Sequence, residues 1–135
     1  FGIGIEMQGL IPSNLYGNTI YHEPIERANE TAHMLKHSKK CDMIICLSHL
    51  GYQYRGSNKI SDKILAAETS NIDLIIGGHT HTFLNTPDRV VNKTNKPVII
   101  SQVGWAGIVL GRLDIYFERN KKDTCVTCKN LMVSS

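Results

Sequence analysis

Two short apolar runs, each leading directly into a histidine-bearing loop, constrain the fold of this chain more than any other feature. Residues 42–47 run into Ser48-His49-Leu50-Gly51, and residues 73–76 run into Gly77-Gly78-His79-Thr80-His81. A continuous apolar run of this length, bounded by polar residues, is typical of a strand that is buried on both faces. Strands of this kind that alternate with helical segments predict a layered α/β domain.

The rest of the sequence supplies the alternating helices and further strands. Residues 1–5, 98–103 and 110–118 predict three more strands. One helix begins at Pro24, since proline is favoured as the first helical residue, and a second begins at Ser61 or Asp62, either of which can cap it. Residues 6–22, and the segment around Pro87 and residues 92–96, have the composition of loops. The predicted order is β-α-β-α-β-β-β, without repeats or a domain linker.

Composition excludes several functional classes. The chain of 135 residues is the size of one domain, and its net charge of +3 comes from scattered basic residues, so no nucleic-acid polymer is expected as a partner. No apolar run approaches the roughly 20 residues needed to span a bilayer, so we expect no transmembrane segment. The opening Phe1-Gly2-Ile3-Gly4-Ile5 is similar to the middle of a buried strand. We therefore expect the chain to be part of a longer protein.

The three loop histidines form a candidate metal site. If the two strands that precede them are neighbours in a sheet, His49, His79 and His81 converge at one rim. Gly77 and Gly78 permit a tight turn and leave room for an ion. Because His79 and His81 are two residues apart, an extended backbone would turn them the same way. Ligation by imidazole suits Zn, Mn or Fe, and the alternative is that the histidines are only hydrogen-bonded structure.

These motifs resemble the last two metal motifs of the calcineurin-like metallophosphoesterases, in the branch of the 5′-nucleotidases and 2′,3′-cyclic phosphodiesterases. The resemblance extends to Phe1-Gly2-Ile3-Gly4, to Pro24-Ile25-Glu26, to residues 42–46 and to Gln102-Val103-Gly104-Trp105-Ala106-Gly107. It covers most of the chain up to about Phe117. It implies that residues 1–135 are a single partial domain, the C-terminal half of a layered α/β/β/α sandwich, with residues after about 119 as a terminal strand or tail.

By this resemblance, His49 and His79 would bind one divalent metal ion and His81 a second. The family's reaction is hydrolysis of a phosphate ester by a metal-bound hydroxide, because a pair of ions about 3.5–4 Å apart acidifies water and clamps phosphoryl oxygens. The implied substrate is a nucleotide or another phosphate monoester or diester. Gly104, Trp105 and Gly107 are candidates for the substrate rim, with Trp105 either in a pocket wall or in the core.

The family's earlier motifs have no counterpart in this sequence. These are Asp-x-His, a Gly-Asp with the bridging carboxylate, and an Asn-His with the general acid, which is expected upstream. A stable zinc site needs three or four protein ligands, so we expect this chain alone to bind metal weakly and to be inactive or nearly so. Half a sandwich would expose apolar sheet surface, which predicts self-association. Family members are usually exported, and we expect the same of the intact protein.

The cysteines have simpler interpretations. Cys41 and Cys46 lie on either side of an apolar stretch and are expected to be core thiols. Cys125 and Cys128 have the spacing of zinc knuckles and redox pairs but lack their context. They are expected to be unremarkable thiols, with a local disulfide or adventitious metal as the alternative.

Other interpretations of the chain remain open beside the hydrolase. His33 and His37 lie four residues apart on the polar face of the first predicted helix and are expected to be surface residues. The main alternative function is a non-catalytic module with a partial or vestigial histidine metal site. A nucleotide-binding regulatory domain is disfavoured, because no glycine-rich phosphate loop opens a helix.

Overall fold

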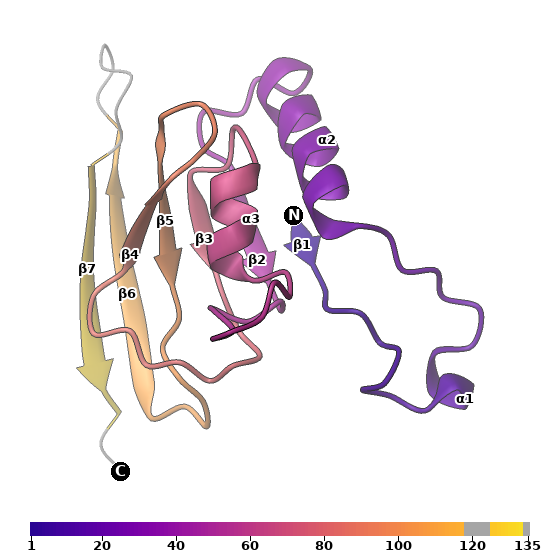
Figure 1. Ribbon diagram of the computed structural model, residues 1–135. Helices are drawn as coiled ribbons and strands as arrows, with labels where there is room; N and C mark the ends of the chain where they lie inside the picture. Colours follow the sequence, from indigo (N-terminus) through magenta and orange to yellow (C-terminus); the bar gives the residue numbers. More distant parts are fainter. Residues whose placement is uncertain (118–124, 134–135) are drawn as a thin grey trace.

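The computed structural model of the chain describes residues 1–117 and 125–133. Its helices are α1 (Ser13–Tyr16), α2 (Pro24–His37) and α3 (Asp62–Glu68). Its strands are β1 (Gly2–Ile3), β2 (Ile45–Ser48), β3 (Leu74–Ile76), β4 (Asp88–Val91), β5 (Pro97–Ser101), β6 (Val109–Tyr116) and β7 (Cys125–Met132). Figure 1 shows a main sheet with α2 and α3 beside it and the β6–β7 pair on the opposite side.

The main sheet is mostly parallel. Its strand order is β1-β2-β3-β5-β4, in which β1, β2, β3 and β5 run parallel and β4 pairs with β5 in the antiparallel sense. Because parallel strands end at the same edge, the segments that follow β1, β2, β3 and β5 all leave from one rim of the sheet. The site described below lies on that rim.

One face of this sheet packs against α2 and α3, and the core lies between them. Ala28 and Ala32 lie one turn apart on α2 and are fully buried, since small side chains let the helix approach the sheet closely. The buried strand residues of the same cluster are Cys46, Ile75, Val98 and Ile100. Pro24 is the first residue of α2, and Ser61 caps α3 by accepting a hydrogen bond from the amide of Ile64, as the sequence predicts.

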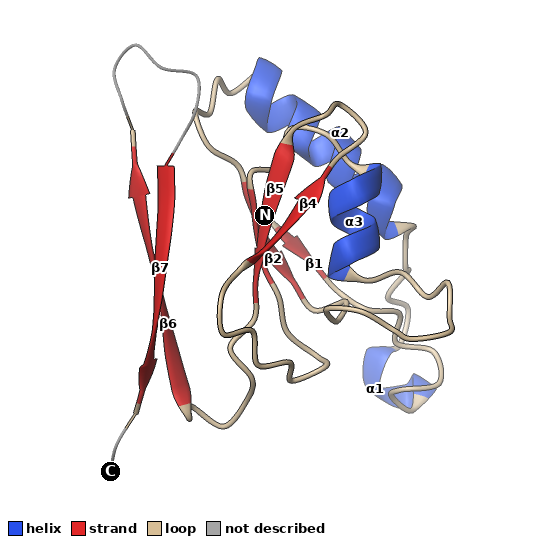
Figure 2. Cartoon of the chain, turned by 60° about the vertical axis from the view of Figure 1, so that its left-hand side comes forward, coloured by secondary structure: helices blue, strands red, loops and turns tan. Residues whose placement is uncertain are grey.

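The opposite face of the sheet is only partly covered. The β6–β7 hairpin stands on this side, away from the helices (Figure 2). It is joined to the body where Asn130 Nδ2 donates to the carbonyl oxygen of Leu84 at 2.7 Å, and where Gly111 faces Val103. Farther along the same face, Leu47 is 57% exposed and Ile76 is 41% exposed.

The α/β class predicted from the sequence is confirmed, but two elements differ from the expected order. The short α1 lies in the segment expected to be a loop, and none of its residues is buried. Strand β4 lies in the predicted loop around Pro87. It begins with the charged pair Asp88-Arg89 and forms the edge of the sheet. Edge strands tolerate charged residues, so the apolar pattern that identifies central strands is absent there.

The cysteines differ in burial, and the two histidines of α2 lie on the surface. Cys46 is fully buried, and burial raises the pKa of its thiol to about 12, whereas Cys41 and Cys128 are half-buried. The backbone of Cys125 lies in β7, but its side chain falls outside the described structure. His33 and His37 are exposed neighbours, with ring centroids 4.3 Å apart. None of the helices in the described ranges is long and apolar enough to cross a membrane.

Candidate metal centre

Two neighbouring strands bring the histidine loops together. Strands β2 and β3 are parallel and pair Cys46 with Ile75 and Leu47 with Ile76. Both strands therefore end at the same level, with His49 directly after β2 and His79 in the turn after β3. The condition that the sequence leaves open, that these strands are neighbours, holds in the structure.

His49 and His79 face each other at the rim. Their ring centroids are 5.2 Å apart and the ring planes meet at 69°. Gly78 belongs to the His79 loop and faces the His49 loop. A Cβ atom there would come within 3.2 Å of His49 Nδ1, so a larger residue would press on the imidazole. Burial, and next the neighbouring His49, lower the pKa of His79 below its ordinary value. A lowered pKa favours the neutral imidazole, which is the form that ligates metals.

His81 has a neighbour of its own. His79 and His81 have φ angles of 69° and 52°, so the segment does not have the extended backbone that is assumed from the sequence. The ring of His81 stacks on Trp105, with centroids 5.8 Å apart and an interplanar angle of 12°. The structure thus pairs His49 with His79, and it places His81 on the same loop against a different neighbour.

A buried glutamine holds the loop that carries His79 and His81. Gln102 Oε1 accepts hydrogen bonds from the Thr82 amide at 2.5 Å and the Thr80 hydroxyl at 3.0 Å. Its Nε2 donates to the Gly78 carbonyl oxygen at 2.6 Å. The side-chain oxygen of Thr80 also accepts from the amide of Tyr52, which belongs to the His49 loop, at 2.9 Å. These bonds fix the loop from below and tie it to its neighbour.

Beneath both loops lies a carboxyl group that the sequence motifs do not point to. Asp62, the first residue of α3, has 0% exposure and accepts a hydrogen bond from the Ser48 hydroxyl at 2.5 Å. Its second oxygen, Oδ2, has no hydrogen-bond partner and lies against Gly77. Burial raises the pKa of Asp62 to about 6, although the hydrogen bond from Ser48 opposes this shift. The only sequence signal at this residue is its position at the start of a predicted helix.

The predicted substrate rim lies beside His81. Gly104 has a φ of 79°, and a Cβ atom there would overlap the ring of Phe83, so this position requires glycine. Trp105 is 56% exposed, which excludes the core position that the sequence leaves open. It begins a tight turn in which Ala106 and Gly107 both have positive φ angles and the Ile108 amide donates to the Trp105 carbonyl oxygen.

His49 and His79 bring two imidazole groups together, and imidazole is a donor that suits transition-metal ions. Across residues 1–117 and 125–133, no group of three or more histidine, cysteine or acidic side chains is gathered closely enough to hold an ion.

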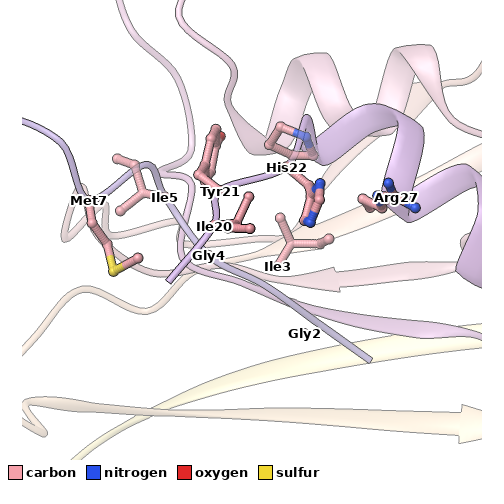
Figure 3. Close-up of a pocket in the computed structure, with 10 residues that line it drawn as sticks. Gly2, Ile3, Gly4, Ile5, Met7, Ile20, Tyr21, His22 and Arg27 are labelled. Atoms are coloured by element: carbon pink, nitrogen blue, oxygen red, sulfur yellow. The ribbon is translucent and has the colours of Figure 1, made fainter. Parts of the chain in front are cut away.

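A separate cavity of about 300 Å³ lies beside β1 and the segment before α2, lined mainly by apolar side chains together with His22 and Arg27 (Figure 3). None of the three loop histidines lines this cavity.

Comparison with known proteins finds relatives of this chain. The family model described as Calcineurin-like phosphoesterase matches residues 5–83. The Trifunctional nucleotide phosphoesterase protein YfkN of Bacillus subtilis (strain 168) is 34% identical over 99 residues, which are 73% of this chain and 6% of that protein. Protein 5NUC of Lutzomyia longipalpis is 34% identical over 89 residues, which are 64% of this chain and 14% of that protein.

A solved structure with the same fold is the 5′-nucleotidase precursor from Thermus thermophilus. It superposes with a TM-score of 0.69 and 29% identity over 82% of this chain and 23% of its own. The chain therefore spans less than a quarter of the length of each of these relatives.

Proposed function

The chain belongs to the calcineurin-like phosphoesterase family, and from that premise we propose that the intact protein hydrolyses phosphate esters of the nucleotide type with two divalent metal ions. One observation carries the proposal. His49 and His79 leave adjacent parallel strands at the same edge and face each other with centroids 5.2 Å apart. Paired imidazoles at a strand edge, within a segment that matches a phosphoesterase family, favour hydrolysis assisted by metal ions.

Each histidine has a proposed role. His49 and His79 hold one ion, and His81 contributes to the second. Zn, Mn and Fe are the expected ions, since imidazole ligands suit them. When bound, such ions supply Lewis acidity toward phosphoryl oxygens and acidify water. The general acid and the bridging carboxylate come from outside these three loop positions.

The substrate rim is proposed to consist of Gly104, Trp105 and Gly107. The indole of Trp105 is exposed next to His81 and offers a flat apolar surface to an incoming substrate. Nucleoside monophosphates, cyclic nucleotides and nucleotide sugars are all compatible with such a rim.

The test uses the intact protein, purified and supplied with Mn²⁺, on a panel of nucleotides and on p-nitrophenyl phosphate. We expect turnover in the wild type and its loss in His79→Ala. His33→Ala is the matched control, because His33 is exposed on α2, outside the two histidine loops. Full activity in His79→Ala would contradict the proposal, as would equal loss in both variants.

Residues 1–135 alone are proposed to be inactive or nearly so. His49 and His79 supply two ligands to one ion, whereas stable zinc sites have three or four protein ligands. A partial site of this kind is also what a non-catalytic module would retain. Robust hydrolysis of p-nitrophenyl phosphate by this chain with Mn²⁺, abolished by His79→Ala, would overturn this part of the proposal.

Self-association of residues 1–135 is proposed from the open face of the sheet. Leu47 and Ile76 are adjacent residues of β2 and β3 and are both exposed there. Exposed apolar sheet surface favours pairing with another copy. Light scattering is expected to show a species larger than a monomer that Leu47→Glu shifts to the monomer. Met34→Glu, on the exposed side of α2, should leave it unchanged, and a monomeric wild type would contradict the proposal.

We also propose that the intact protein is exported, on the family resemblance alone. Fractionation of cells that express it should recover it outside the cytoplasm or at the cell surface. Recovery only from the cytoplasm would contradict this.

A further inference from the structure

The carboxyl group of Asp62 lies where the two histidine loops meet, and the proposed reaction gives it no role. It belongs to α3, not to either loop, and has no solvent exposure. Its amide donates to the carbonyl oxygen of Gly51 at 2.8 Å, so the start of α3 is itself fastened to the end of the His49 loop. A buried carboxyl group needs compensating interactions, and the hydrogen bond that this one receives comes from Ser48, the residue before His49.

On one side, Asp62 fixes the residues that bracket His49. The Ser48 hydroxyl donates to Asp62 Oδ1 at 2.5 Å, and the same hydroxyl oxygen accepts from the Leu50 amide at 3.2 Å. The residues before and after His49 are thereby joined through one buried hydroxyl group. The His49 backbone cannot rotate without breaking this chain of hydrogen bonds.

On the other side, Asp62 limits how closely the His79 loop can approach. Oδ2 lies so near Gly77 that a Cβ atom on Gly77 would overlap it. The next residue, Gly78, is held by the hydrogen bond from Gln102 and packs against the His49 ring. The carboxylate therefore acts as a spacer under the second loop while it anchors the first.

We infer that Asp62 is a positioning residue that sets the separation of the His49 and His79 rings, anchoring Ser48 with one oxygen and supporting Gly77 with the other. It touches neither imidazole and acts only through the loops. Its effect on metal ligation rests on the proposed function, but its effect on the metal-free ring geometry does not. Residues that orient ligands in this way commonly change metal affinity by about 10–100-fold when they are mutated.

The test measures ring geometry and metal affinity separately on the full chain. In the metal-free protein, NMR detects the contact between the ring protons of His49 and His79, and a titration with Co²⁺ alone measures affinity. Asp62→Ala should abolish the ring contact and weaken Co²⁺ binding about 10–100-fold. Asp62→Asn keeps the size of the side chain and an acceptor for Ser48, so it should restore the ring contact.

Thr69→Val is the matched control. Thr69 is equally buried and ends α3 with a 2.6 Å hydrogen bond to the Leu65 carbonyl oxygen, far from either loop along the helix. It should lower stability but keep the ring contact. Loss of the contact in Thr69→Val as well as in Asp62→Ala would overturn the inference, because any destabilisation of α3 would then suffice. Retention of the contact in Asp62→Ala would also overturn it.

A second variant and the metal-free measurement cover the cases in which Asp62→Ala does not fold or the wild type binds no metal. If Asp62→Ala does not fold, Ser48→Ala removes only the link to His49, and an unchanged ring contact in that variant overturns the inference. If the wild type binds no Co²⁺ but the ring contact follows the expected order, the positioning role stands on the ring geometry alone. The proposed function is then decided separately, by the activity of the intact protein and its His79→Ala variant.

Discussion

A carboxyl group that is fully buried beneath two loops makes the stability of the fold depend on pH. Burial is the largest influence on Asp62 and raises its pKa from 3.8 to about 6, with the Ser48 hydrogen bond acting in the opposite direction. In the unfolded chain the group titrates near its ordinary value. Between these two pKa values the folded state binds more protons than the unfolded state, so stability falls as pH rises through this window.

Asp62→Asn should remove this pH dependence. Below pH 4 both states of the wild type are protonated at this residue, and the stabilising effect of the raised pKa is fully present. It is lost as pH rises through about 6. The stability of Asp62→Asn relative to the wild type should therefore increase between pH 4 and 7, by up to about 3 kcal/mol. Urea unfolding of both proteins at intervals across this pH range measures the difference. Profiles of stability against pH that run parallel for the two proteins would contradict the raised pKa of Asp62.

The candidate ligands could be predicted from the sequence because each follows a recognisable apolar run. The contact of His81 with Trp105 could not, since the segment that carries His81 has left-handed backbone conformations at two residues other than glycine. The structural roles of Asp62 and Gln102 could not be predicted from the sequence either. Their importance comes from burial and from hydrogen bonds to residues 14 and 24 positions away, and no local pattern records such contacts.

At the scale of elements, the junction between α3 and the end of β3 is packed too closely for any side chain on Gly77. The φ angle of Gly77 is not positive, so its need for glycine is steric. Asp62 cannot swing aside, because its other oxygen is bonded to Ser48 in a fully buried site. The helix and strand are thus held at a spacing that the Asp62 carboxylate sets.

Gly77→Ala should lower the free energy of unfolding by about 1–3 kcal/mol, the usual cost of overpacking. Gly4→Ala is the control, because Gly4 has a φ angle outside the positive region and no heavy atom within 4 Å of a Cβ atom there. It should change stability by less than about 0.5 kcal/mol. Equal effects of the two substitutions in chemical denaturation would show that the contact with Asp62 does not decide the outcome.

Elements with a strong apolar signal were the ones that the sequence predicted. Strands β2, β3 and β5 are central in the sheet, and their composition is nearly continuous and apolar. The predicted burial on both faces is wrong for β2 and β3, because Leu47 and Ile76 are exposed on the face away from the helices. Strand β4 owes its place to pairing with β5, and α1 is a single turn without buried residues. Their formation depends on tertiary neighbours or on local turns, which apolar periodicity does not detect.

At the scale of the whole molecule, the protein is built from one well-packed layer pair and one loosely attached hairpin. The core lies between the sheet and its two helices, and the β6–β7 pair forms a second sheet of its own. Asn130 on β7 bridges to the carbonyl oxygens of Leu84 and Asn85 at 2.7 and 3.3 Å. Units with few contacts to the rest of a protein open at a lower free energy than the core.

Asn130→Ala should therefore accelerate amide hydrogen exchange in β6 and β7 and leave exchange in β2 and β3 unchanged. The alanine leaves two carbonyl oxygens without their donor, so the closed position of the hairpin loses stability while the main sheet keeps all its bonds. Thr127→Ala is the matched control, because Thr127 is exposed on β7 and pairs across to Asp114. If exchange quickens equally in all four strands, the hairpin opens only with the whole domain. If amide exchange does not change in β6 and β7, the hydrogen bonds of Asn130 do not hold the hairpin against the rest of the protein.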